Sequence, residues 1–177
     1  HHPTGKSMAS LHTVMEMQAD IFMQAGVPVH AAEKIMEERM REVGHSVHPI
    51  NHFQVVDTAR ILGVNFINTH TITDNLVQKF LLDLVRKAKP ETLGELIEEL
   101  MKIEEYREAR RRVAGPKIVS GNTKNRIGKM VIEMTGGTNP SNLMYQELAN
   151  AGISTILGMH MKEDAVKKAN DSRLNIV

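Results

Sequence analysis

The amino-acid sequence predicts an α/β fold in which helices cover a mixed, partly parallel sheet. Apolar residues recur at helical spacing through much of residues 1–113, and short apolar runs alternate with helical segments over residues 114–177. At 177 residues, with 41% hydrophobic residues, the chain can bury a substantial core. We therefore expect one α/β domain, or part of one, over residues 1–177, helix-rich in its first segment and alternating in its second.

Three helices are predicted in the first third of the chain. The first would be capped by Ser7 or Ser10 and would end at Gly26-Val27-Pro28, because a glycine followed by a proline is a typical helix ending. Two more helices, each followed by a glycine, are predicted over about residues 31–43 and 51–62.

The middle of the chain is predicted to contain one strand followed by helices. Residues 64–68, Val-Asn-Phe-Ile-Asn, have the composition of a strand, which would end at a loop that carries His70 and Asp74. Asp74 would then cap a helix over residues 75–88, with its apolar residues on one face. A further helix is predicted from about residue 89 to 103.

The alternation of strands and helices begins after Gly115-Pro116. Strands are predicted over residues 117–119, 128–134, 153–157 and 174–177, and helices over residues 141–151 and 162–170. A turn at Gly121-Asn122-Thr123 would join the first two strands. The strand–helix–strand–helix–strand series indicates a partly parallel sheet with helices on its faces.

Composition excludes several classes of protein. The formal net charge of +1 argues against a nucleic-acid-binding face, and around a predicted charged turn at Arg110 the arginines are interleaved with glutamates, which is typical of a solvated helix face. The absence of cysteine excludes disulfides and thiolate metal sites, and it suits a cytoplasmic protein. No apolar run approaches the roughly 20 residues that would cross a membrane.

The residues that carry chemistry lie far apart in the sequence. His1-His2-Pro3 supplies two adjacent imidazoles, and His70-Thr71-Ile72-Thr73-Asp74 supplies a third imidazole and a carboxylate. These groups are good ligands for zinc, manganese, iron or nickel, and their chemistry does not select one of these metals. Adjacent histidines on an extended strand end point to opposite faces, so they serve two metals more easily than one, and a bridging aspartate gives a dinuclear site that activates water.

Each of these residues also has a simpler interpretation, which the sequence leaves open. His1-His2 could be the remnant of a purification tag. His70 could be a strand-end histidine that is hydrogen-bonded to the backbone. Asp74 could act only as a helix N-cap, although one carboxylate can both cap a helix and coordinate a metal.

Two other short patterns are similar to turns that bind phosphate or another anion through backbone N–H groups. Pro3-Thr4-Gly5-Lys6-Ser7 is similar to the end of a P-loop, although the first glycine of that motif would precede His1. An ATP-binding domain is therefore a weaker alternative to a metal site. Thr135-Gly136-Gly137-Thr138 could present backbone N–H groups to an anion, although a plain strand-to-helix turn is the simpler interpretation.

In combination, the motifs resemble a known family, the Nif-three-like dinuclear-metal proteins, many of which carry the label GTP cyclohydrolase 1 type 2 homolog. His1-His2-Pro3 is similar to the family's His-His-Pro motif, and His70 to Asp74 is similar to its His-Thr-x-x-Asp motif. Further segments are similar to segments of one branch of the family, and they extend the resemblance over nearly the whole chain. These segments are Met15–Asp20, Pro49–His52, Asp74–Val77, Ala114–Lys117, Met134–Thr138 and Gly158–Met161.

The resemblance implies that His1, His2 and Asp74 are metal ligands, with two divalent ions in a complete site. It implies that His70 acts beside the site, orienting a ligand or carrying a proton. Family members complete the site with a Gly-His motif and a nearby acidic residue, which would follow Val177. We therefore expect this chain to be an internal fragment that lacks the N-terminal strands and a C-terminal segment.

For activity, the resemblance implies a homo-oligomeric, hydrolase-type protein that acts on a small molecule through a phosphoester or a cyclic C–N bond. The substrate is not specified. The alternative is a non-catalytic metal-binding protein that regulates a partner.

Overall fold

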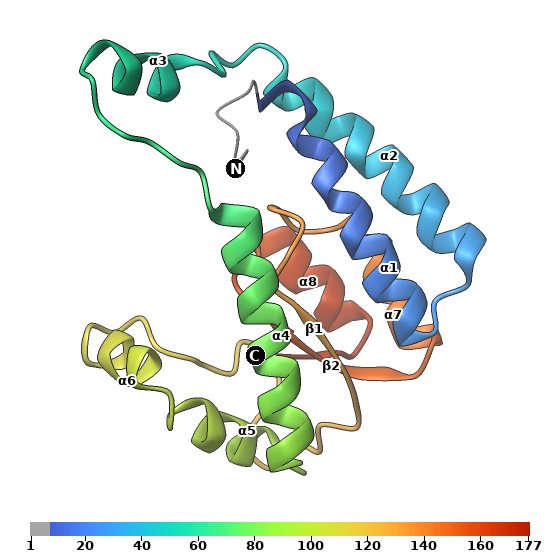
Figure 1. Ribbon diagram of the computed structural model, residues 1–177. Helices are drawn as coiled ribbons and strands as arrows, with labels where there is room; N and C mark the ends of the chain where they lie inside the picture. Colours follow the sequence, from blue (N-terminus) through green and yellow to red (C-terminus); the bar gives the residue numbers. More distant parts are fainter. Residues whose placement is uncertain (1–7) are drawn as a thin grey trace.

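A three-stranded parallel sheet lies between two layers of helices in the computed structural model, which describes residues 8–177 and their side chains from residue 12 onward (Figure 1). The strands lie in the order β1 (Lys129–Glu133), β2 (Ile153–Gly158) and β3 (Asn175–Ile176). Two helices, α7 (Met144–Asn150) and α8 (Glu163–Asp171), connect consecutive strands, because parallel neighbours need a crossover connection. The predicted alternation is therefore confirmed from β1 onward.

The helices before the sheet are η1 (Met8–Met15, a 3₁₀ helix), α1 (Glu16–Ala25), α2 (Val29–Val47), α3 (Gln54–Ile61), α4 (His70–Ala88), α5 (Leu93–Leu100) and α6 (Glu104–Arg111). Helix α1 ends as predicted, since Gly26 has a φ of 109° and its N–H bonds back to the last turn. Helix α5 begins with a capping box in which the Thr92 hydroxyl accepts from the Glu95 N–H and the Glu95 carboxylate accepts from the Glu91 N–H.

Alternate residues of the strands enter two separate hydrophobic clusters, one on each face of the sheet. Val131 and Ile156 pack with residues of α1, α2, α7 and α8. Their neighbours Ile132 and Leu157 pack on the opposite face with residues of α4 and α5. Successive side chains of a strand point to opposite faces of a sheet, so neighbouring residues of β1 and β2 pack against different helices. Helices α1 and α4 therefore lie on opposite sides of β1.

Both outer edges of the sheet have hydrogen-bond partners. On the β1 edge, the Gln78 side chain of α4 donates to the Ile132 carbonyl at 2.5 Å and accepts from the Met134 N–H at 2.8 Å. On the β3 edge, Ser120 forms an antiparallel bridge with Ile176. The Gln78 amide thus takes the place of a neighbouring strand and holds the middle of α4 against β1.

Because Gln78 satisfies two backbone groups, we expect Gln78→Leu to lower the free energy of unfolding by about 2 kcal/mol, measured by urea denaturation. Leucine has a similar volume but leaves the Ile132 carbonyl and the Met134 N–H without that partner. The matched control is Gln24→Leu at an exposed position of α1, where a change within about 0.5 kcal/mol is expected. Equal effects of the two substitutions would contradict this role for Gln78.

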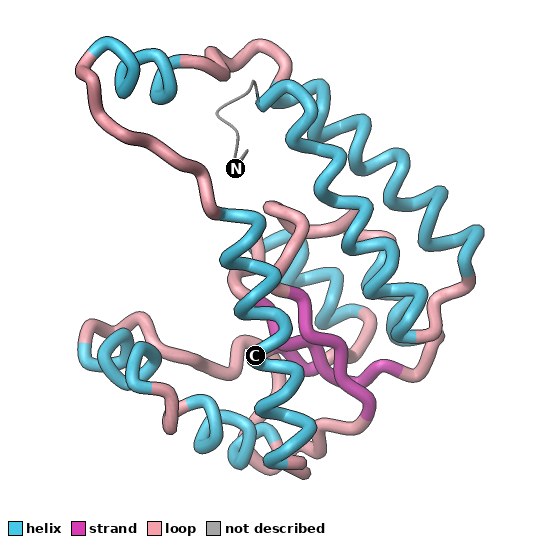
Figure 2. The backbone as a smooth tube through the Cα atoms, in the orientation of Figure 1, coloured by secondary structure: helices cyan, strands magenta, loops and turns pink. Residues whose placement is uncertain are grey.

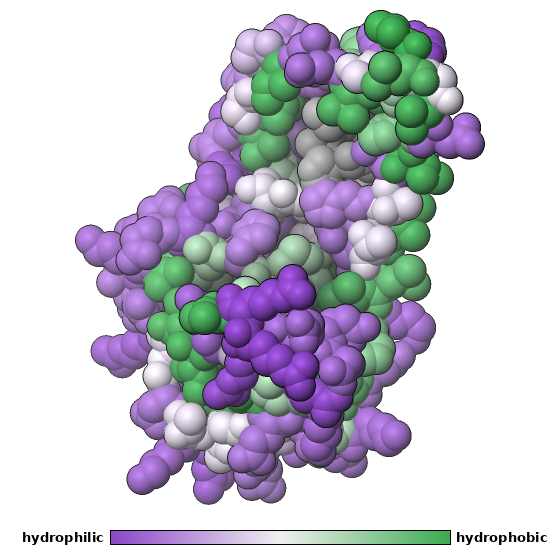
Figure 3. Space-filling view, turned by 90° about the vertical axis from the view of Figure 1, so that its left-hand side faces the viewer, coloured by the Kyte–Doolittle hydropathy of each residue, from purple (hydrophilic) through white to green (hydrophobic). Residues whose placement is uncertain are grey.

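Residues 48–69 form an arm, which extends away from the sheet and contains α3 (Figure 2). The predicted strand over residues 64–68 is wrong, because this segment is a largely exposed loop and no strand formed by residues 8–177 pairs with it. An apolar run becomes a strand only when a neighbour can pair with it. Large apolar side chains gather on the surface of the arm, at the top of Figure 3, and include Ile50, Phe53, Val55, Ile61, Leu62, Val64, Phe66 and Ile67.

Two more expectations are corrected between the arm and β1. Residues 117–119 do not form a strand or a hairpin with β1; the Val119 N–H instead donates to the Ile176 carbonyl at the far edge of the sheet. Pro116 and Gly121 interrupt the chain on either side of this segment, and it forms only the single bridge between Ser120 and Ile176. The charged stretch around Arg110 is not a turn but lies in helix α6.

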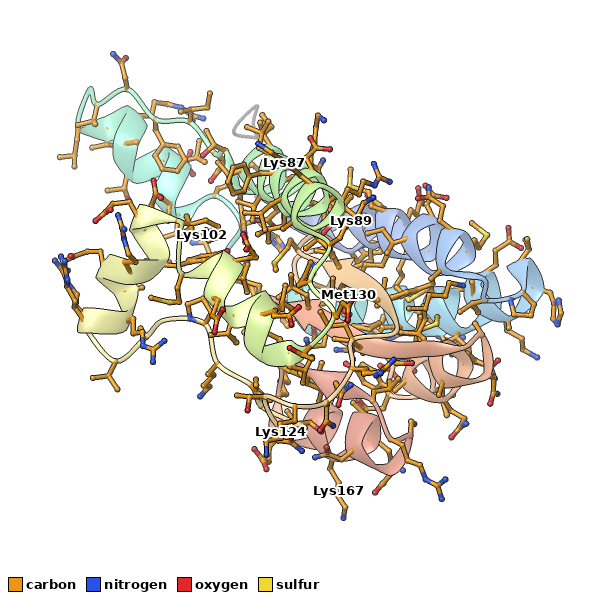
Figure 4. All side chains as sticks on the ribbon, turned by 90° about the horizontal axis from the view of Figure 1, so that it is seen from below. Lys87, Lys89, Lys102, Lys124, Met130 and Lys167 are labelled. Carbon is orange, nitrogen blue, oxygen red and sulfur yellow. The ribbon has the colours of Figure 1, made fainter. Side chains whose placement is uncertain are left out.

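The surface charges are dispersed. Ion pairs between residues three or four apart line α6, including Arg107 with Glu104 and Arg111 with Glu108, as the interleaved sequence predicts. Lysines seen from below belong to different elements and are spread over the face (Figure 4), and the labelled ones are Lys87, Lys89, Lys102, Lys124 and Lys167. Within residues 8–177, no helix combines the length and the apolar character that a membrane span needs.

Candidate functional site

The candidate site is a small pocket at the carboxyl edge of the parallel sheet. It has a volume of about 40 Å³, which is room for an ion or a few water molecules. Its walls come from the start of α4, the end of β1 with the loop that follows it, and the end of β2 with its own loop; they include His70, Asp74, Glu133, Thr138, Gly158 and His160. Ligands of open α/β sheets commonly bind at this edge.

Asp74 is buried in the pocket wall, with only 6% of its surface exposed. Its Oδ2 lies 3.2 Å from the Nε2 of His70, one helical turn earlier. Burial raises the pKa of Asp74 above its ordinary value, whereas His70 and His160 lower it. The carboxylate is therefore poorly solvated, and a cation beside it would stabilise its ionised form.

The sequence places Asp74 at a helix N-cap, and the structure corrects this. Helix α4 already begins at His70, and Asp74 lies inside its second turn. The Thr73 hydroxyl donates to the His70 carbonyl at 2.8 Å and so helps to close the first turn. Because residues four apart share one face of a helix, the turn brings the imidazole and the carboxylate together, which a loop would not guarantee.

Of the predicted metal ligands, the structure places only Asp74. His1 and His2 lie outside the described residues, as do the P-loop-like residues 3–7. Within residues 12–177, no group of three histidine or acidic side chains is arranged to hold a metal ion. The described part of the chain therefore supplies only part of a metal site: one buried carboxylate with a histidine nitrogen 3.2 Å from it.

Two amide side chains fasten the loops around the pocket. The buried Gln18 of α1 donates from Nε2 to the Glu133 carboxylate at 2.8 Å and to the Thr138 carbonyl at 2.7 Å. Asn139 donates to the His160 carbonyl at 2.9 Å and accepts from the Lys162 N–H at 3.1 Å. The loop after β1 is thus tied both to α1 and to the loop after β2, so the pocket has a defined shape.

Sequence reasoning gave no role to two ionisable residues of the pocket, Glu133 and His160. Glu133 ends β1, and burial raises its pKa to about 8 although the Gln18 amide opposes this shift. A glutamate at the end of the apolar run Met130–Met134 is a signal that could have been used, because a charged residue there is costly unless it has a task. His160 lies in the segment Gly158–Met161, which resembles the family, but the resemblance assigned it no role.

Comparison with solved structures identifies the fold. The chain superposes on the crystal structure of a NIF3 superfamily protein from Sphaerobacter thermophilus with a TM-score of 0.75 and 20% sequence identity, over 94% of this chain and 62% of that chain. No family model and no curated protein matches the sequence. The chain therefore has a NIF3-like α/β fold, as predicted, and it spans less than two thirds of the length of the protein that it matches.

Proposed function

We propose that this chain is part of a metal-dependent hydrolase-type protein in which Asp74 is a ligand of a divalent metal ion. The observation that supports this is the buried Asp74 carboxylate, 3.2 Å from the His70 imidazole, at the carboxyl edge of a NIF3-like sheet. By the resemblance of the sequence motifs, His1 and His2 would be further ligands, and two ions of zinc, manganese, iron or nickel would occupy the complete site.

The described residues have distinct roles in this proposal. When bound, a divalent metal supplies Lewis-acid activation of water for attack on a phosphoester or a ring C–N bond. Asp74 binds it through a carboxylate whose desolvation favours a nearby cation. His70 holds one oxygen of that carboxylate and so fixes its orientation, and as a half-exposed imidazole it can also carry a proton to or from solvent.

The wider setting is also part of the proposal. We place the protein in the cytoplasm because the chain has no cysteine, and we propose that it forms a homo-oligomer with a small-molecule substrate. The remaining ligands would come from the Gly-His segment that the family resemblance places beyond Val177.

A second candidate function is a non-catalytic metal-binding protein that regulates a partner. The exposed apolar surface of the arm favours it, since such surfaces commonly mark contacts with other proteins. Turnover of a substrate that is lost in Asp74→Ala would support the enzyme. Metal binding that changes only the affinity for a partner would support the regulator.

The proposed metal site is tested by elemental analysis and calorimetry on this chain and on a longer version that continues through the Gly-His segment. We expect the longer protein to bind close to two ions, and Asp74→Ala to weaken binding by more than the roughly 10- to 100-fold typical of residues that only hydrogen-bond to a ligand. His70→Ala should cause a loss within that smaller range.

The control is Asp83→Ala on the same helix, an exposed carboxylate that is paired with Lys79 and lies outside the pocket. It should leave metal affinity unchanged. A longer protein that binds no metal, or one in which both aspartate variants behave alike, would exclude Asp74 as a ligand.

A further inference from the structure

A second cavity adjoins the Asp74 pocket and shares Gly137 and Thr138 with it. It has a volume of about 330 Å³, which lies within the roughly 300–1,000 Å³ typical of small-molecule sites. Helix α2, the end of η1 and the turn after β1 form its walls. Gly137 and Thr138 therefore lie between the two cavities, and a molecule bound in the larger one would be next to the Asp74 pocket.

Cationic side chains converge on this cavity from different elements. Arg39 comes from α2, and Lys162 comes from the loop between β2 and α8. The Arg39 side chain is only 22% exposed, and its Nε donates to the Asn139 carbonyl at 3.3 Å, so the guanidinium is held in place. Its partner Glu42, 2.9 Å from Nη1, is 64% exposed, and such an exposed pair is readily exchanged for a better acceptor.

The glycine turn after β1 adds backbone donors to the same wall. Gly136 and Gly137 have φ angles of 96° and 77°, which glycine adopts without strain. Within residues 12–177, neither of their N–H groups donates to another protein group. Successive backbone amides in such turns form concave sites for anions. Of the two readings of Thr135–Thr138, the geometry favours the anion-binding turn.

We propose that this cavity binds the phosphate group of a phosphorylated small molecule, with Arg39 and Lys162 as its cationic contacts. A guanidinium suits this task because its planar N–H groups match two oxygens of a phosphate at once. We further propose that the reacting bond of this molecule lies beside Asp74, and this step rests on the proposed function. The binding of phosphate in the cavity does not.

The test is a titration of the chain with inorganic phosphate, followed by NMR chemical shifts in the presence of EDTA so that no metal contributes. We expect saturable shifts at the Gly136-Gly137 turn, and affinities at least about tenfold weaker in Arg39→Gln and in Lys162→Gln. Arg41→Gln, an exposed arginine on the same helix, removes the same charge outside the cavity and should bind like the unmodified chain.

Lys162 is exposed, so its substitution tests the site even if Arg39→Gln fails to fold. No saturable shift at the turn, or an equal loss in Arg41→Gln, would overturn the proposal. Asp74→Ala separates this inference from the proposed function, because this variant should lose metal binding but keep phosphate binding. In addition, a small phosphate monoester should bind the chain at least as tightly as free phosphate. An ester that does not compete with phosphate would also overturn it.

Discussion

Gly136→Ala is expected to lower the free energy of unfolding by about 3 kcal/mol. Residue 136 has a φ of 96°, and an added Cβ would lie 2.5 Å from Cδ of Gln18. Gln18 has no exposed surface and is held by hydrogen bonds to Glu133, Thr135 and Thr138, so it cannot move aside without breaking them. Urea denaturation followed by circular dichroism measures the loss.

Gly152→Ala is the matched control for this substitution. Gly152 has a similar φ of 81°, but an added Cβ there meets no atom within 4 Å. It should cost only the backbone strain, about 1–2 kcal/mol. The difference between the two variants reports the collision with Gln18. If the two losses are equal, Gln18 does not brace the turn that separates the two cavities.

Glu133→Gln should make the protein more stable at pH 8.5 and have little effect at pH 5. Burial raises the pKa of Glu133 from its ordinary 4.5 to about 8. Between these values the unfolded chain releases the proton and the folded chain keeps it, so the free energy of unfolding falls as pH rises through this window. Glutamine has no proton to lose and its amide oxygen can still accept from Gln18, so the variant escapes a loss of roughly 2–4 kcal/mol.

The measurement is the free energy of unfolding of both proteins at several pH values from 5 to 9, in EDTA. The difference between them removes the contributions of all the other ionisable groups, which the two proteins share. We expect this difference to grow with pH and to level off above about pH 8. A difference that stays constant with pH, or a less stable glutamine variant at pH 8.5, would show that the Glu133 carboxylate is well solvated or has a cation beside it.

Local sequence patterns correctly predicted β1, β2 and the end of α1, because the packing around these elements matches the local pattern. The alternating runs of β1 and β2 lie in a sheet that is buried on both faces, and the glycine after α1 ends that helix. Residues 64–68 have the same apolar character as those strands but lie on the arm, where no strand among residues 8–177 pairs with them. Composition cannot distinguish these cases, because pairing depends on residues far away in the chain.

The candidate site could be predicted only in part for a similar reason. The sequence motif named His70 and Asp74, whose side chains lie 3.2 Å apart in the structure, but it did not indicate that one helix holds both residues. Glu133 and the cavity around Arg39 depend on contacts between elements more than 90 residues apart, such as the bonds from Arg39 to Asn139 and from Gln18 to Glu133. No pattern within one segment contains that information.

The most direct test of the central claim is anomalous diffraction from crystals of the longer protein grown with manganese or zinc. The proposal predicts an anomalous peak about 2.0–2.2 Å from an Asp74 carboxylate oxygen, within the pocket at the carboxyl edge of the sheet. An ordered metal that is bound elsewhere, with no peak beside Asp74, would contradict it.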